Sequence, residues 1–196
     1  QLKQMQWERL HQVNGSIQLS NNPELETIDF PILDTAGMIQ LTGNNLLKSV
    51  QLPKLTLLSG ETHEGLQYQG HALWITDNAK LAELRFPSLR KALADCSFRQ
   101  NHSLQTVAAP QLTTLRGKLA LNYQRELKQV QLPTLDSLHG SLQLESNGPF
   151  ASFALPSLSY IQEDFIIQYN KELKRLSLPQ LSYIGGDALA VFNALD

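Results

Sequence analysis

The sequence predicts an all-β solenoid of about eight turns, each of about 23 residues. Three observations lead to this fold class. A short proline motif recurs at a nearly constant spacing, apolar residues keep fixed places within each repeat, and an asparagine closes most repeats. Together they indicate one turn of chain per repeat, with parallel strands stacked along a single long core.

The repeat is defined by an apolar-Pro-x-Leu motif. It recurs at Pro31, Pro53, Pro87, Pro110, Pro133, Pro156 and Pro179. The spacings are 22, 34, 23, 23, 23 and 23 residues, so the long one is a repeat with an insertion of eleven residues at about 61–71. Because a unit this short cannot bury its own apolar face, neighbouring units must stack and share one core.

Each repeat contains a short strand and has no room for a useful helix. Leu142-Gln143-Leu144 alternates apolar and polar residues, which is typical of a strand with Gln143 facing outward. A proline in every unit and many β-branched residues disfavour helix. With strands about 4.8 Å apart, eight turns would form a rod roughly 38 Å long.

The aromatic residues support this register. Most phenylalanines fall on inward positions, namely Phe30, Phe86, Phe98, Phe150, Phe153 and Phe165. The five tyrosines and two tryptophans fall elsewhere, as expected for side chains whose polar atom needs a partner. Cys96 also occupies an inward position, so we interpret it as a small core residue rather than a reactive thiol.

An asparagine recurs at one place in the repeat, directly after the strand. It is present at Asn22, Asn44, Asn78, Asn101, Asn147, Asn170 and Asn193. A turn at this place leaves backbone donors and acceptors inside the rod, and a carboxamide can satisfy both kinds. The sequence therefore predicts an asparagine ladder along the axis, which we expect Gln124 to distort with its extra methylene.

The repeat resembles the receptor L-domain family, which includes ligand-binding lobes of insulin- and epidermal-growth-factor-type receptors and a class of fungal cell-wall proteins. The similar segments are NNPELETIDFPIL (21–33), NNLLKSVQLPKL (44–55), LHGSLQLESN (138–147) and NKELKRLSLPQLSYIGG (170–186). The resemblance covers residues 10–193. It implies a right-handed β-helix similar to a leucine-rich repeat, used outside the cell for recognition or wall structure.

One departure from that family limits what the resemblance implies. The receptor domains are stapled by disulfides, which a chain with 1 cysteine cannot form internally. We therefore infer a microbial surface protein, extracellular or at the cell surface, with the periplasm as the alternative location. No ligand of the animal receptors is carried over to this chain.

Composition narrows the function classes further. The net charge is −2 and charged residues make up 17% of the chain, without the basic run typical of nucleic-acid binders. No apolar stretch approaches the length of a membrane span. No nucleophile elbow or phosphate loop is present, so we predict a protein without enzymatic activity or cofactor.

The predicted ligand-binding residues face outward on the strand that precedes the asparagine ladder. They are Trp74, Arg99, Tyr123, Ile166 and Tyr169, with Tyr68 from the insertion alongside. Aromatic rings, an arginine and amides on one face suit a protein or glycan partner. The alternative is that these are scattered surface aromatics, which are ordinary in soluble proteins.

The insertion ETHEGLQYQGH (61–71) is expected to emerge beside Trp74, where a loop on a rigid scaffold could carry specificity. Its acidic and histidine residues raise a metal hypothesis, for Glu61, His63, Glu64 and His71. Their spacing matches no helical or hairpin ligand pattern, so no metal is predicted.

Three rival functions remain open. The chain could be a structural wall or stalk spacer without a specific ligand. It could be a carbohydrate-active β-helix enzyme, for which Asp164 and Asp187 on neighbouring turns, with Glu163 beside the first, would supply paired carboxylates. It could also be an intracellular leucine-rich-repeat adaptor.

The ends of the solenoid carry their own expectations. Residues 1–9 are expected to form an amphipathic helical cap, with Leu2, Met5 and Trp7 against the first turn. Residues 10–196 form the single solenoid, which stops part-way through a repeat. We therefore expect the natural chain to continue, or this end to pair with another copy or domain. Tyr160 and Tyr183 share one place on adjacent turns, so their rings should stack.

Overall fold

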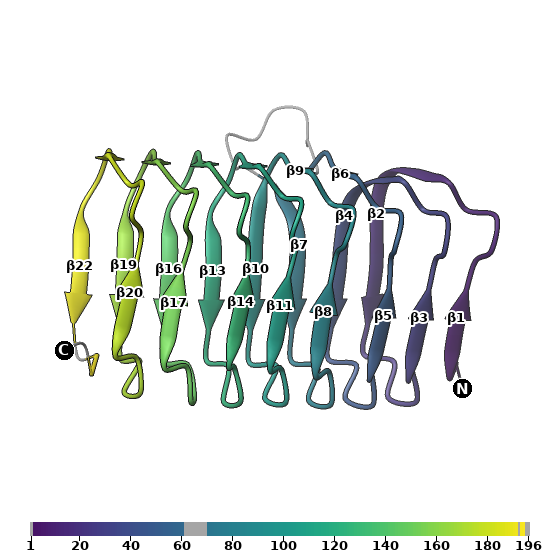
Figure 1. The fold of residues 1–196 in the computed structure, drawn as a ribbon. Coiled ribbons are helices and arrows are strands. Elements are labelled where there is room, and N and C mark those ends of the chain that lie inside the picture. Colours follow the sequence, from purple (N-terminus) through teal and green to yellow (C-terminus); the bar gives the residue numbers. More distant parts are fainter. Residues whose placement is uncertain (1, 61–69, 192, 195–196) are drawn as a thin grey trace.

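The computed structural model describes residues 2–60, 70–191 and 193–194. These residues form parallel strands and turns and no helix, which confirms the predicted all-β solenoid. Among them there is accordingly no helix that could cross a membrane. Figure 1 shows the turns side by side, from the purple N-terminal turn to the yellow C-terminal one.

The sheet nearer the viewer in Figure 1 is called the front sheet. Its paired strands are parallel and three residues long. They are β1 (Gln4–Gln6), β3 (Thr27–Asp29), β5 (Ser49–Gln51), β8 (Glu83–Arg85), β11 (Thr106–Ala108) and β14 (Gln129–Gln131), followed by the separate pair β17 (Ser152–Ala154) and β20 (Arg175–Ser177).

The back sheet contains the longer strands. They are β2 (Gln12–Ser20), β4 (Thr35–Thr42), β7 (His71–Thr76), β10 (Asp95–Arg99), β13 (Leu119–Asn122), β16 (Leu142–Glu145), β19 (Phe165–Gln168) and β22 (Ala188–Val191).

A third ladder of two-residue strands connects the front sheet to the back sheet at the upper edge in Figure 1. It contains β6 (Leu57–Leu58), β9 (Lys91–Ala92), β12 (Thr114–Leu115), β15 (Ser137–Leu138), β18 (Tyr160–Ile161) and β21 (Tyr183–Ile184). The long strand β4 joins it to the back sheet, since Thr35 and Ala36 pair with β6 while Ile39 to Thr42 pair with β7.

The strand register reproduces the sequence spacing. Phe98 pairs with Leu121, and Leu121 with Leu144, each 23 residues apart. Leu41 pairs with Ile75 across the longer third unit, so the insertion leaves the phase of the back sheet intact. Residues 61–69 of that insertion lie outside the described residues.

One continuous apolar core runs through the turns, from Ile17 to Leu173. Phe98, Leu121 and Leu144 are all buried, as the predicted register requires. The six phenylalanines assigned to inward positions are buried too. Cys96 is part of this core, and burial raises the pKa of its thiol to about 12, so it is a packing residue.

The predicted asparagine ladder is present and follows one hydrogen-bonding rule. Asn147 Nδ2 donates to the carbonyl of Leu121 at 2.8 Å and to Oδ1 of Asn170 at 3.1 Å. Asn147 Oδ1 accepts the backbone N–H of Gln124 at 3.2 Å. Equivalent bonds join Asn22, Asn44, Asn78, Asn101, Asn170 and Asn193 to their neighbours.

Gln124 continues the ladder with a local change of partner. Its Oε1 accepts the backbone N–H of Asn101 at 3.1 Å, as an asparagine oxygen does elsewhere. Its Nε2 donates to the carbonyl of Asn122 at 3.0 Å, a bond within its own turn of the kind that Asn78 and Asn170 also make. The expected distortion is therefore confined to the amide nitrogen.

The residue before each ladder amide from Asn22 to Asn170 adopts a left-handed backbone. The positive φ values are 56° at Asn21, 66° at Gly43, 55° at Asp77, 54° at Gln100, 60° at Tyr123, 54° at Ser146 and 58° at Tyr169. This conformation reverses the chain at the end of the back strand. Asn, Asp and Gly tolerate it best, whereas a bulky side chain is strained there.

The expected helix at residues 1–9 is wrong, because the segment instead adds strand β1 to the front sheet. Met5 pairs with Ile28 and packs against the core. Trp7 stacks on Phe30 with ring centroids 4.9 Å apart, whereas Leu2 is 46% exposed. A helix of this length is marginal in water, while a strand satisfies the open edge of β3.

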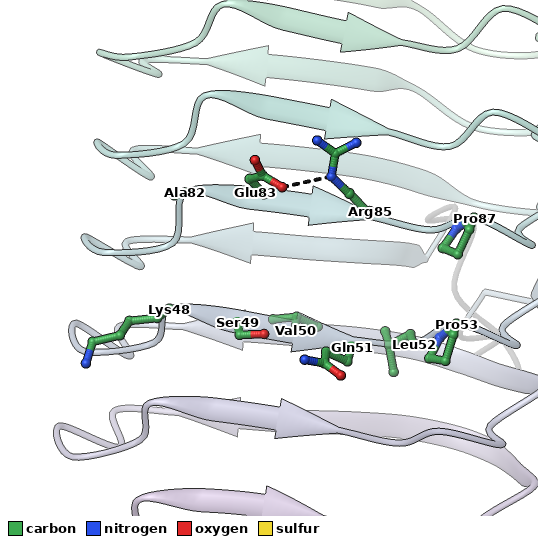
Figure 2. Close-up of a pocket in the computed structure, with 10 residues that line it drawn as sticks. All are labelled: Lys48, Ser49, Val50, Gln51, Leu52, Pro53, Ala82, Glu83, Arg85 and Pro87. Carbon is green, nitrogen blue, oxygen red and sulfur yellow. Dashed lines mark hydrogen bonds and ion pairs between the residues drawn. The ribbon is translucent and has the colours of Figure 1, made fainter.

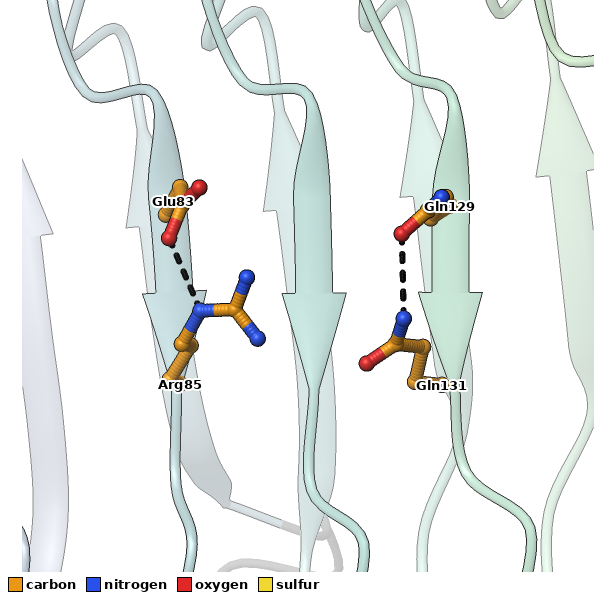
Figure 3. A network of polar contacts seen from close by, with 4 residues as sticks. All are labelled: Glu83, Arg85, Gln129 and Gln131. Atoms are coloured by element: carbon orange, nitrogen blue, oxygen red, sulfur yellow. Dashed lines mark hydrogen bonds and ion pairs between the residues drawn. The ribbon is translucent and has the colours of Figure 1, made fainter.

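The outer face of the front sheet is covered around β11 by polar side chains. In Figure 3, Glu83 and Arg85 bond along β8 at 2.8 Å, and Gln129 and Gln131 bond along β14 at 3.0 Å. Strand β11 lies between these pairs, and its outward residues Thr106 and Ala108 are only 7% and 3% exposed. The outward residues of β11 are therefore covered, while the polar side chains on either side of them are exposed.

The predicted tyrosine stack is also present. The rings of Tyr160 and Tyr183 are 5.0 Å apart and nearly parallel, at 7°. They occupy β18 and β21, which pair directly. Their contact with each other accounts for the pair without a ligand.

Replacing Asn147 with Ala should lower the free energy of unfolding by about 1–3 kcal/mol, because the carbonyl of Leu121 and the N–H of Gln124 lose their partners inside the rod. Urea unfolding measures the change. The exposed Asn14→Ala variant is the control and should leave the midpoint almost unchanged. An unaltered midpoint for Asn147→Ala would contradict a structural role for the ladder.

The Cys96 thiol should resist alkylation in the folded protein, because burial holds it protonated. Iodoacetamide labelling followed by mass spectrometry is expected to modify Cys96 only after denaturation. Labelling of the native protein at the rate of a free thiol would show that Cys96 is accessible.

Candidate functional site

The back sheet aligns one outward residue from each strand into a row, called here the central row. Its members are Gln18, Gln40, Trp74, Ser97, Ala120, Gln143, Ile166 and Leu189. Trp74 is the largest of them and is 39% exposed. The row thus combines one indole, three amides, two small residues and two aliphatic residues on consecutive strands.

A hollow of about 760 Å³ opens along the central row, and is called here the back hollow. Trp74 lines one part of it, and the small residues Ser97 and Ala120 on the next two strands leave space beside the indole. Gln40 and Gln143 also line the back hollow from the strands on either side. Along the row the lining runs from Gln18 to Gln143, which is five strand spacings or about 24 Å, and the part from Trp74 to Gln143 is about 14 Å.

A bulge places His71 at the edge of the back hollow. The register of β7 and β10 shifts between Asp95 and Cys96, so that His71 faces Asp95. Bulges of this kind re-aim side chains. The imidazole packs edge-on against Trp74, with ring centroids 4.0 Å apart at 89°. Burial lowers the pKa of His71, and the opposing effect of Asp95 is smaller, so the ring is neutral at pH 7.

The carboxylates beside the central row hold the backbone of the next turn. Asp95 Oδ1 accepts the N–H of Lys118 at 2.7 Å, and Asp164 Oδ1 accepts the N–H of Asp187 at 2.9 Å. Ser141 Oγ accepts the N–H of Asp164 at 3.3 Å in the same way. The pair proposed for an enzyme, Asp164 and Asp187, is therefore connected by a structural bond.

Arg99 and Tyr123 form a second feature next to the back hollow. The Arg99 guanidinium lies over the Tyr123 ring, 5.2 Å from its centroid. The Tyr123 hydroxyl donates to Glu145 Oε1 at 3.0 Å. This bond and the Glu145 charge raise the pKa of Tyr123, and Arg99 opposes them. The result is a linked group of exposed side chains from three neighbouring turns.

Tyr123 and Tyr169 are both held in the left-handed conformation, with φ of 60° and 58°. Other turns place Asn, Gly, Asp, Gln or Ser at this position. For a bulky residue this backbone costs about 1 kcal/mol or more, and such strain collects at functional sites. The two tyrosines therefore carry more backbone strain than the smaller residues that occupy this position in the other turns.

The structure brings some of the predicted ligand-binding residues together and separates others. Trp74 and Arg99 both line the back hollow, and Tyr123 contacts Arg99. Ile166 follows Gln143 in the central row, and Tyr169 follows β19, so both lie on the same face beyond the hollow. Tyr68 lies outside the described residues.

The metal hypothesis gains no support from the described part of the chain. Glu61, His63 and Glu64 lie outside it, and His71 packs against Trp74. Elsewhere among residues 2–60, 70–191 and 193–194, no three His, Cys, Asp or Glu side chains gather as metal ligands would.

A second opening lies in the front sheet, between β5 and β8. These strands are matched only through Gln51 and Arg85, whereas β8 and β11 are paired over three residues. The resulting slot has a volume of about 430 Å³. Figure 2 shows Val50 and Leu52 on one side, with Pro53 and Pro87 at one end. The slot is therefore an apolar gap in the front sheet, whereas the back hollow lies on the back sheet.

Sequence reasoning missed the concave part of the site. Ser97 and Ala120 carry no signal of their own in the sequence, because small residues are ordinary in a repeat. Alignment of the repeats could have found them, since they fall in register between Trp74 and Gln143. The placement of His71 opposite Asp95 depends on the bulge, for which the sequence carries no signal.

Comparisons with known proteins give no match to a family model, to a curated protein or to a solved structure. The β-solenoid itself rests on the strand pairing described above. The more specific resemblance to receptor L-domains rests on the sequence segments alone.

The stability of the protein should decrease as the pH falls below 6.5, the ordinary pKa of histidine, in part because of His71. Below this pH the unfolded chain binds a proton more readily than the folded chain, in which the pKa of His71 is lowered, so protons favour unfolding. Urea unfolding between about pH 7.5 and about pH 5 would measure the slope.

The His71→Gln variant should show a smaller slope than the wild type over this pH range. The variant His11→Gln, which removes an exposed imidazole, serves as the control. Identical slopes for His71→Gln and the wild type would show that His71 titrates alike in both states.

Proposed function

We propose that the chain is a recognition module of an extracellular or cell-surface protein, which holds a protein or glycan partner on the outer face of the back sheet. The observation that carries this proposal is the back hollow, in which an exposed indole borders two small residues in a row otherwise rich in amides. Exposed aromatic side chains beside a concave surface are favourable binding elements.

Rigidity supports the same function. The back strands are fixed to one another by parallel pairing, and the ladder amides fix the turns that follow them. The side chains of Trp74, Arg99 and Tyr123 are therefore displayed with spacings that change little on binding. A preorganised surface of this kind loses less entropy when a partner binds.

We propose more specifically that the chain belongs to a microbial surface protein of the receptor L-domain type, with a right-handed, leucine-rich-repeat-like β-helix. Its support is the set of similar segments, such as NNPELETIDFPIL (21–33), together with a turn of about 23 residues. The surface location follows from this resemblance.

A structural spacer is the second candidate function. Its support is that bonds such as Asp95 to Lys118 and Asp164 to Asp187 tie each turn to the next, which suits a stiff rod. A carbohydrate-active enzyme is less well supported, because the carboxylate of Asp164 is already engaged in such a bond.

The proposed function is tested by screening the protein against arrays of glycans and surface proteins. Trp74→Ala should weaken binding of any partner at least about tenfold, because the indole is the largest exposed apolar group at the hollow. Trp7→Ala is the matched control, since Trp7 is 42% exposed but lies in the N-terminal segment. A spacer would bind neither array, and equal binding by both variants would place the partner elsewhere.

A further inference from the structure

The size of the back hollow favours a small polar ligand over a protein surface. Its volume of about 760 Å³ falls within the range of small-molecule sites, roughly 300–1,000 Å³. A protein partner instead requires about 800 Å² of matching surface on each side, usually flat and centred on clustered apolar anchors. Along the central row the hollow offers a single indole, followed by Ser97 and Ala120.

The lining of the back hollow is rich in groups that both donate and accept hydrogen bonds. Gln40 and Gln143 contribute carboxamides from strands on either side of the small residues. Asn122 contributes one from β13, the strand that contains Ala120. A carboxamide can donate two hydrogen bonds and also accept. This chemistry matches a ligand with several hydroxyl groups, each of which donates and accepts in the same way.

Two polar atoms of the lining residues lack a partner. Among the described residues, buried side-chain atoms without a hydrogen bond are His71 Nδ1, His102 Nδ1 and Asn122 Oδ1. Two of these three residues line the back hollow. Buried polar groups are nearly always satisfied, and an unmade bond costs about 1–3 kcal/mol. Asn122 Oδ1 can only accept, so a small turn of its side chain toward an entering hydroxyl would satisfy it.

Trp74 supplies an apolar surface beside the carboxamides that line the back hollow. The edge of His71 packs against the indole and helps to hold its orientation. The space beside the indole lies over Ser97 and Ala120, between Trp74 and Gln143. A ligand that fits has one C–H-rich face for the ring and hydroxyls around its rim, which is the chemistry of a pyranose.

We propose that the back hollow is a saccharide-binding site, in which one sugar ring lies against Trp74 and its hydroxyls bond to Asn122 and Gln143. This inference rests on the proposed recognition function and narrows its ligand to a glycan. The charged side chains at the rim include both signs, with Asp95 at the start of β10, Lys118 directly before β13 and Arg99 at the end of β10. The ligand class is therefore set by hydroxyls rather than by a strong charge.

The site can be tested by tryptophan fluorescence, because the chain has 2 tryptophans. In the Trp7→Phe variant, Trp74 is the remaining indole, and its emission should shift when soluble gluco-, manno- or galacto-oligosaccharides bind. The Trp74→Phe variant, which reports from Trp7, should show no shift. Polygalacturonate oligomers form the acidic arm of the same titration.

Calorimetry with the best saccharide gives the second readout. Trp74→Ala and Asn122→Ala should each weaken binding at least about tenfold, whereas Asn14→Ala should bind as the wild type does. Thermal melting of each variant confirms that it is folded before titration.

Saccharide binding that leaves the Trp74 emission and the affinity of Trp74→Ala unchanged would overturn this site. Binding of a protein but of no saccharide at the hollow would overturn the saccharide inference and leave the recognition function standing. If neither class of ligand binds, both proposals fail.

Discussion

The structure depends on the amide ladder at the turn that follows each back strand. The chain reverses there through a left-handed residue, and the backbone groups of the turn face the inside of the rod. The ladder amides satisfy them and bond to one another, as Asn147 does with Leu121 and Asn170. Apolar packing is not directional and would tolerate a slipped turn. The directional amide bonds fix the register, and with it the alignment of every outward row.

The candidate site lies where the residue types differ from those at the same repeat positions in other turns. Trp74 stands between Gln40 and Ser97 in the central row, and Tyr123 and Tyr169 occupy a left-handed position that suits smaller side chains. Both openings adjoin β7 or β8, the strands of the unit that contains the insertion. Irregular register in that unit, at the Asp95 bulge and between β5 and β8, separates side chains that regular pairing would bring into contact.

Two sequence-based expectations needed correction. In both, the conformation expected from a short stretch of sequence competes with a hydrogen-bond partner that the neighbouring turn provides. The first nine residues were expected to be helical, but the open edge of β3 offers hydrogen bonds to a strand, and Met5 reaches the core from there. Gln124 was expected to distort the ladder. It keeps the bond from Asn101 because its longer side chain can still bring Oε1 to that N–H. Neither outcome is visible without the neighbouring turn.

The sequence by itself determined the repeat, the buried positions and the asparagine ladder, because each unit carries the same apolar and amide pattern and stacking is the only way to bury it. It also identified Trp74, Arg99 and Tyr123 as outward-facing residues. Only the tertiary structure decided that the first two share a hollow, that His71 meets Asp95 across a bulge, and that Asp164 bonds to the next turn. Those features arise between turns, where a change of one residue in register determines which side chains meet, and no single repeat encodes that.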